Sequence, residues 1–246
     1  MFSVLDMFTI GVGPSSSHTV GPMCAAQAFA SSLEESGAVS RVGRIRVVLY
    51  GSLSLTGLGH GTDRAILAGL EGNVPATVDT DYLLSVRERC AHDGTIHVNG
   101  TNAIAYDDDG DMVFDRWKRL APHPNGMRFQ AFDAQGNIID EQVWYSIGGG
   151  FIRRGRIDDA LISNHEQTPA SSQSPEDSGN DEAAEYGDGV PYPFVSCDGL
   201  IDLCRKHHLS IADVVWANET ARRSPQEVRD RLTRIWNVRS LSLIHI

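Results

Sequence analysis

Hydrophobic and polar positions follow more than one period along the first 150 residues of the chain. Between residues 23 and 33, apolar side chains recur three or four positions apart, which predicts an amphipathic helix. Its buried stripe is expected to hold Ala25, Ala26, Phe29 and Leu33. Residues 44–50 are rich in β-branched side chains and predict a strand. The glycine-punctuated segment 51–57 is expected to continue from that strand as a loop.

Further along, one more helix and a hairpin are predicted. The helix is expected to be capped by Thr62 and Asp63, to run to Leu70, and to be ended by Gly72. Apolar and polar residues alternate over 127–132 and 138–147 around a turn at 133–137, which predicts a β-hairpin. The second hairpin strand runs into three glycines at 148–150, where a ligand can approach the backbone closely.

The C-terminal third has a different pattern. Residues 167–188 are rich in Ser, Glu, Asp and Gly and predict a mobile acidic linker. From residue 191 onward three helical stripes follow, and the last is capped by Ser224 with Pro225 at its first position.

These patterns predict an α+β fold. We expect a sandwich-like mixed α/β domain at 1–152, a flexible linker at 153–190, and the first helices of an all-helical domain at 191–239. Residues 240–246 follow no cap or turn pattern, so we interpret the chain as a fragment with a non-native tail.

Composition narrows the class of protein. The 246 residues carry a formal net charge of −11, from 21 basic and 32 acidic side chains, which argues against a broad nucleic-acid surface. No signal peptide and no apolar run of about 18 residues is visible, so no membrane span is expected. The four cysteines show no disulfide framework, which favours reduced thiols, a cytoplasmic protein and no metal site within this chain.

The segment GPSSSHT at 13–19 is the first candidate for chemistry. A helix start offers free N–H groups and the positive end of the helix dipole, which together attract an anion such as a carboxylate. His18 titrates near neutral pH and can move a proton. The alternative is that one of these hydroxyls is an ordinary helix cap. We predict that the substrate-binding hydroxyls are Ser15, Ser16, Ser17 and Thr19.

A second segment, YGSLSLTGLGHGTD at 50–63, repeats this pattern of glycines, hydroxyls and one histidine. His60 is a candidate general base, and Thr62 and Asp63 are candidate substrate ligands. Asp63 has two further interpretations, as a group that orients an imidazole or as a cap of the helix. The whole segment also fits a simple glycine-rich connection with a surface histidine.

A stiff turn at 122–126, with two prolines and Asn-Gly, holds His123 ahead of a strand. His123 and Asn125 are candidate ligand contacts, although a histidine in a surface turn is more often inert. Nucleotide-binding and nucleophile-elbow motifs are absent from the sequence.

Taken together, these segments resemble the iron–sulfur L-serine dehydratases (L-serine ammonia-lyases) of the single-chain type. The resemblance is carried by FTIGVGPSSSHTVGPM at 8–23 and YGSLSLTG at 50–57. Shorter matches follow in order: GHGTD at 59–63, GNVPATVD at 72–79, NGM at 125–127, YSIGGGFI at 145–152, PYPF at 191–194 and NE at 218–219.

The resemblance implies an N-terminal β portion, similar to an allosteric substrate-binding domain, followed by a helical portion with a [4Fe–4S] cluster. It implies that L-serine is converted to pyruvate and ammonia, in amino-acid catabolism and gluconeogenesis. His18 and His60 match histidines near the active site, whereas His123 matches one implicated in serine binding elsewhere. No cysteine here matches the cluster ligands, so we expect this part of the enzyme to bind no cluster and to be inactive alone.

We also expect a homodimer. Two alternatives stay open. One is a regulatory serine-binding domain with no direct catalytic role, and the other is a hydrolase that uses one of the serines with a histidine.

Overall fold

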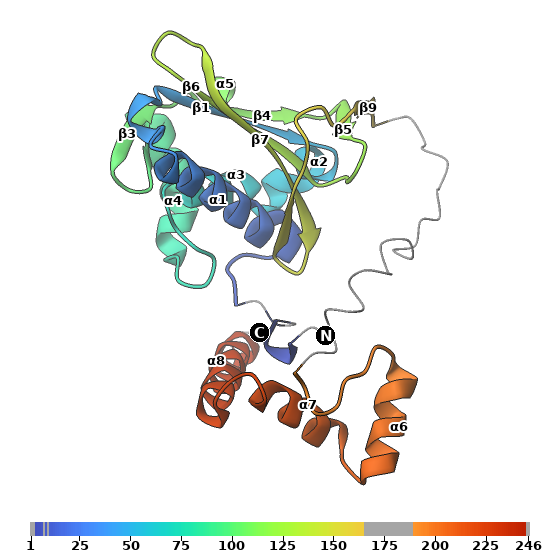
Figure 1. Ribbon diagram of the computed structural model, residues 1–246. Coiled ribbons are helices and arrows are strands. Elements are labelled where there is room, and N and C mark those ends of the chain that lie inside the picture. The colour runs from blue at the N-terminus through green and yellow to red at the C-terminus, as the bar shows by residue number, and fades with distance from the viewer. Residues whose placement is uncertain (1–2, 7, 9, 165–188, 245–246) are drawn as a thin grey trace. The chain divides into compact units, whose positions relative to one another are not determined.

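The computed structural model describes residues 3–6, 8, 10–164 and 189–244 (Figure 1). The chain divides into two compact units, residues 11–167 and residues 1–10 together with 168–246. The predicted acidic linker at 167–188 lies outside the described residues.

The larger unit contains a mixed sheet with helices against one face (Figure 1). Within the described residues, the sheet is built from β1 (Arg44–Tyr50), β2 (Thr95–Val98), β3 (Asn102–Ala105), β4 (Met112–Asp115), β6 (Gly126–Phe132), β7 (Ile138–Gly148) and β8 (Phe151–Arg154). Their order is β2-β3-β1-β6-β7-β8, and β4 also pairs with β1. β1 is parallel to β3 and β4 and antiparallel to β6. Two short strands, β5 (Lys118–Leu120) and β9 (Leu161–Ser163), form a separate antiparallel pair.

Three longer helices lie beneath the sheet: α1 (Gly21–Glu35), α3 (Thr62–Leu70) and α4 (Thr80–Asp93) (Figure 1). A π-helical turn, η2 (Ser16–Val20), leads directly into α1. The remaining short helices of this unit are η3 (Val39–Arg41), α2 (Ser52–Thr56), η4 (Gly57–His60) and α5 (Asp108–Asp111).

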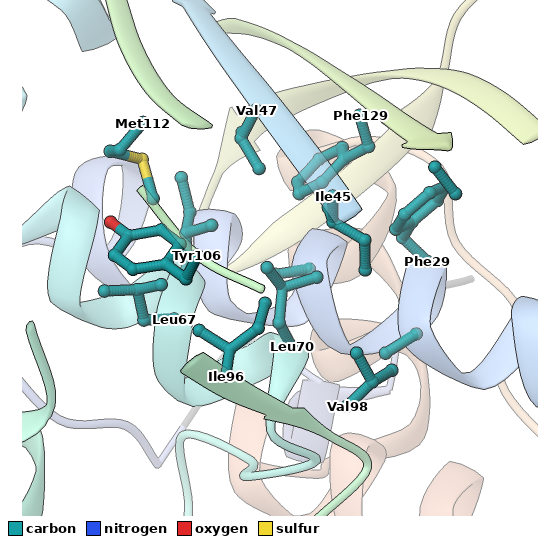
Figure 2. Close-up of a cluster of buried hydrophobic side chains, with 14 of the residues drawn as sticks. Phe29, Ile45, Val47, Leu67, Leu70, Ile96, Val98, Tyr106, Met112 and Phe129 are labelled. Atoms are coloured by element: carbon teal, nitrogen blue, oxygen red, sulfur yellow. The ribbon is translucent and has the colours of Figure 1, made fainter. Parts of the chain in front are cut away.

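The core of this unit lies between the sheet and these helices (Figure 2). Phe29 of α1 stacks on Phe129 of β6 with ring centroids 5.2 Å apart, and both side chains are fully buried. Burial of each such side chain stabilises the fold by roughly 1.5–3 kcal/mol. The core therefore fixes α1 and α3 firmly under β1. Candidate site residues lie directly before the start of α1 and in the first turn of α3.

Several predicted elements are confirmed. The α+β class holds, β1 has the predicted bounds, and the hairpin is β6 and β7. The helix predicted at 23–33 extends over 21–35, with the predicted stripe of Ala25, Ala26, Phe29 and Leu33 fully buried.

The predicted loop at 51–57 is wrong, because this segment forms α2. Gly51 turns the chain with φ +57°, and the Ser52 N–H then donates to the carbonyl of Pro124 (2.9 Å). Leu53 is fully buried while Leu55 is exposed, as one helical turn requires. Five residues are too few for a helical period to show in the sequence.

The predicted boundary at 152 also differs from the structure. It falls inside β8, and β9 pairs with β5, so residues 153–164 are part of the folded larger unit. At the other end, residues 1–10 group with the C-terminal helices. The physical reason is a pair of hydrogen bonds. Buried Glu219 accepts from Ser3 Oγ and from the Val4 N–H, both at 2.8 Å.

The smaller unit contains the 3₁₀ turn η1 (Val4–Asp6) and three helices: α6 (Cys197–His207), α7 (Ile211–Thr220) and α8 (Pro225–Ile244). Ser224 caps α8 as predicted, since its Oγ accepts from the Glu227 N–H (3.2 Å). The backbone of α8 stays helical to Ile244, although no helical pattern was expected beyond residue 239. Across the described residues, no helix combines the length and the apolar character that crossing a membrane requires.

Candidate active site

Two histidines from separate predicted segments meet in the larger unit. His18 lies in η2 and His60 is the last residue of η4. Their ring centroids are 4.9 Å apart and the rings are tilted by 42°. The two glycine–histidine segments therefore face one another.

The two segments are joined by a crossed pair of threonine hydrogen bonds. Thr19 Oγ1 donates to the carbonyl of His60 (2.8 Å), and Thr62 Oγ1 donates to the carbonyl of His18. Both threonine side chains are buried. This differs from the prediction that Thr19 and Thr62 bind substrate, because each hydroxyl is already used to hold the backbone of the opposite histidine.

The tautomer of His60 follows from its contact with the backbone. His60 Nδ1 lies 2.9 Å from the carbonyl oxygen of Thr56, which can only accept a hydrogen bond. Nδ1 therefore carries the proton, and the Nε2 of a neutral ring keeps its lone pair. No hydrogen bond from another described residue occupies that Nε2.

His18 has a hydroxyl at each ring nitrogen. Nδ1 lies 2.9 Å from Ser17 Oγ, and Nε2 lies 3.0 Å from Ser52 Oγ. Burial lowers the pKa of His18, the neighbouring His60 lowers it further, and a hydrogen bond with the Ser52 backbone acts in the opposite direction. His18 is therefore biased towards the neutral form at neutral pH.

The three serines lie at the start of the helix, as predicted. Ser15 precedes η2, and its Oγ accepts from the His18 N–H (3.2 Å). Ser17 is in contact with the His18 ring, and Ser16 is exposed. The His18 N–H is thus already used, whereas the N–H groups of Ser16 and Ser17 have no acceptor within the helix and remain available to an anion.

Asp63 does not face the histidine pair as a free carboxylate. It is buried, and its Oδ2 accepts from Arg87 Nη1 at 2.5 Å. Arg87 also binds Asp108 of α5 through Nε and Nη2. The predicted capping role is not observed either, because the N-cap of α3 is Gly61 with φ +67° and no side chain caps the helix. The contact with Arg87 makes Asp63 an anchor for α3.

His123 and Asn125 lie in a separate environment, beside Tyr145. The His123 ring centroid is 6.2 Å from that of Tyr145, and Arg153 lies over the same tyrosine ring. Burial lowers the pKa of His123, and the charge of Arg153 lowers it further. Asn125 is held by its side-chain donation to the carbonyl of Ser146 (3.1 Å).

Sequence reasoning missed two residues that build this site. Ser52 was expected in a loop, and Arg87 lies in no recognisable sequence motif. Ser52 stands in the same segment as His60, so the hydroxyl pattern contained a signal for it. Nothing local identifies Arg87, because its partners are 24 and 21 residues away.

The described residues do not fit an iron–sulfur cluster. They contain no group of three or more His, Cys, Asp or Glu side chains that could hold a metal ion. All four cysteines are free thiols. Burial raises the pKa of Cys24, and it raises that of Cys90 to about 12, so both are protonated at neutral pH.

Comparison with known proteins gives a consistent result. Residues 3–156 match the family described as the serine dehydratase beta chain. A protein of Streptomyces coelicolor named L-serine dehydratase is 41% identical over 236 residues, which cover 96% of this chain and 48% of that protein.

Two other relatives agree with this. L-serine dehydratase 2 of Escherichia coli is 38% identical, over 97% of this chain and 47% of its own length. The L-serine dehydratase of Haemophilus influenzae is 33% identical, over 100% of this chain and 49% of its own length. The chain spans about half the length of the curated relatives that it matches.

Proposed function

The chain belongs to the serine dehydratase beta chain family, and from that premise we propose that it forms one wall of an L-serine ammonia-lyase active site. The reaction is the dehydration and deamination of L-serine to pyruvate and ammonia. The observation that carries the proposal is the His18–His60 pair, held 4.9 Å apart beside the start of a helix.

His60 is the better placed of the two histidines to take the α-proton of serine. Its Nδ1 proton is held by the Thr56 carbonyl, which leaves Nε2 as the basic atom. The ring nitrogens of His18 both face hydroxyls instead. We therefore propose His60 as the general base and His18 as a neutral group that contacts the substrate.

The serines and the helix start are the groups that would recognise the carboxylate of the substrate. We propose that the exposed Ser16 and the first N–H groups of η2 bind the serine carboxylate, because the positive end of the helix dipole favours an anion there. Ser15 and Ser17 contribute by fixing His18.

The surroundings of His60 favour a site that another surface covers. Leu55 of α2 is 56% exposed and Leu58 of η4 is 46% exposed. Large apolar side chains exposed in this way around a polar centre are typical of an interface. We propose that they are buried when the remainder of the enzyme closes over serine.

The finer assignments are proposals of the same kind. We propose that a [4Fe–4S] cluster, when present, is held by cysteines outside these 246 residues, since the described residues offer no ligand set. We further propose a cytoplasmic homodimer that acts in amino-acid catabolism and gluconeogenesis. Analytical ultracentrifugation of the full-length enzyme tests the dimer.

Anaerobically prepared full-length enzyme tests the activity. We expect oxygen-sensitive formation of pyruvate from L-serine, and loss of most of that turnover in His60→Gln with unchanged iron content. His92→Gln is the matched control, because the His92 side chain is 88% exposed. Absence of pyruvate from the iron-loaded wild-type enzyme would exclude the proposed activity.

A second candidate function is a regulatory site for serine, favoured by the half-buried His123 beside Tyr145 and Arg153. We expect His123→Ala to change the cooperativity of serine turnover and to leave the maximal rate nearly unaltered. A loss of maximal rate with unchanged cooperativity contradicts the regulatory role. A hydrolase is disfavoured, because a hydroxyl and not a carboxylate lies at Nδ1 of His18, where a triad needs its orienting acid.

A further inference from the structure

Ser52 is the one hydroxyl of α2 that is directed out of its own helix. Ser54 Oγ donates to the carbonyl of Gly51 (2.8 Å), and Thr56 Oγ1 donates to the carbonyl of Ser52 (3.0 Å). Ser52 Oγ instead lies 3.0 Å from Nε2 of His18, 34 residues away in the sequence. It does not cap α2, whose N-cap is Gly51. Its hydroxyl is therefore free for His18.

The position of Ser52 is fixed by the turn at 122–126. The Ser52 N–H donates to the carbonyl of Pro124 (2.9 Å), and the Gly51 N–H donates to that of Lys118 (3.0 Å). A Cβ at Gly51 would lie 2.3 Å from the Pro124 oxygen, so only glycine permits this approach. Two backbone hydrogen bonds thus hold the main chain at Gly51 and Ser52 in place.

The consequence for His18 follows from its geometry. An imidazole rotates about its bond to Cβ unless contacts hold the ring. Ser17 Oγ and Ser52 Oγ hold the two ring nitrogens from opposite sides, and the ring stays tilted by 42° to that of His60. Ser17 is the immediate neighbour of His18 and moves with it. Ser52 belongs to a different helix, so its hydroxyl holds the His18 ring relative to the rest of the fold.

We propose that Ser52 is a positioning residue for His18, which sets the ring orientation with which His18 meets the substrate. The catalytic consequence rests on the proposed function, whereas the effect on the His18 ring does not. The Pro124 carbonyl then connects the turn that carries His123 to His18 through a single residue.

The first experiment measures the His18 ring without any need for activity. The 246-residue chain, labelled with ¹⁵N-histidine, is titrated by two-dimensional NMR that reports the pKa and tautomer of each imidazole. In Ser52→Ala we expect shifted ¹⁵N signals of the His18 ring, because Nε2 loses its contact with the Ser52 hydroxyl. Ser52→Thr keeps the hydroxyl and is expected to restore the wild-type signals.

Ser54→Ala is the matched control, since it removes a hydroxyl from the same helix that bonds only to Gly51. Its His18 signals should match those of the wild type. Spectral dispersion in the same experiment shows whether each variant is folded. Wild-type His18 signals in a folded Ser52→Ala chain would overturn the proposal.

The second experiment measures turnover in the anaerobically prepared full-length enzyme. A hydrogen bond of the usual net strength corresponds to about tenfold in rate, so we expect Ser52→Ala to lower kcat about tenfold with little change in KM. Ser52→Thr should recover most of the rate, and Ser54→Ala should lose none. An unchanged kcat in Ser52→Ala overturns the positioning role in catalysis. If the wild-type enzyme makes no pyruvate, the proposed function fails, and the NMR titration still decides whether Ser52 orients His18.

Discussion

At the scale of single residues, the histidine pair is held through the backbone as much as through the rings. Thr19 and Thr62 each bind the carbonyl of the opposite histidine, and both are buried. A buried hydroxyl that already donates to a carbonyl is worth more to stability than to substrate binding, since removing it leaves that carbonyl unsatisfied. The polar atoms that remain exposed to a ligand are therefore fewer than the hydroxyl-rich sequence indicates.

The lowered pKa values of His18 and His123 predict how stability depends on pH. Burial is the first cause in both cases, and it places the folded pKa below the ordinary value of 6.5. Below that value the unfolded chain binds protons that the folded chain does not, so the free energy of unfolding falls as the pH drops. The contribution is fully present above pH 6.5 and is lost as the pH falls through the folded pKa values.

We expect urea denaturation between about pH 7 and about pH 5 to show this loss, and a shallower dependence in the His18→Gln/His123→Gln variant. His92→Gln, at an exposed position, should keep the wild-type slope. A double variant as steep as the wild type would contradict the assignment to these two histidines.

At the scale of elements, α3 is anchored at the end that carries the site. Asp63 in its first turn is buried, and its pairing with Arg87 of α4 joins the two helices. Arg87 continues to Asp108 of α5, which in turn accepts from the hydroxyl of Tyr106 (2.7 Å). Two other helices, α4 and α5, thus fix the helix start that follows His60.

Removal of Arg87 tests this anchor. Arg87→Leu leaves the Asp63 carboxylate buried without its cation, and we expect it to lower the free energy of unfolding by about 3–5 kcal/mol. Adding Asp63→Asn should recover part of that loss, because the uncompensated charge is gone. Chemical denaturation monitored by circular dichroism measures both variants.

Arg156→Leu is the control, since Arg156 pairs with Asp158 at an exposed site and its loss should change stability little. Equal effects of the two arginine substitutions would show that the Asp63–Arg87 pair is not an anchor.

At the scale of the whole molecule, the chain consists of two units, and different interactions stabilise each of them. The buried residues of the hydrophobic core beneath the sheet lie between Ala25 and Ala131, and Ile139, Trp144 and Ile152 of the same larger unit pack against them. In the smaller unit, Glu219 ties residues 3 and 4 to α7 and also pairs with Arg223. The histidine pair and the crossed threonines all belong to the larger unit.

We therefore expect a polypeptide of residues 11–167 to fold by itself. Its thermal unfolding should be cooperative, and its ¹⁵N-histidine spectrum should reproduce the His18 and His60 signals of the 246-residue chain. An unfolded polypeptide, or histidine signals at random-coil positions, would show that the larger unit depends on the rest of the chain.

Much of this protein follows from local sequence. The buried stripe of α1, the bounds of β1 and the β6–β7 hairpin can be predicted, because side-chain periods of 3.6 and 2 mark which face of an element is buried. The same is true of a helix start rich in hydroxyls around His18. These features depend on neighbours a few residues apart.

Only the tertiary structure decided which of the polar groups remain available for chemistry. Thr19, Thr62 and Asp63 are adjacent in sequence to the candidate histidines, yet their partners lie 24 to 44 residues away. The helix α2 and the contact of Ser52 with His18 likewise depend on the carbonyl of Pro124, far along the chain. The sequence by itself determined α1, β1, the β6–β7 hairpin and the two histidine segments, because periodicity is local. The roles of their hydroxyls and carboxylates depended on which distant donor or acceptor the fold brings within hydrogen-bonding distance.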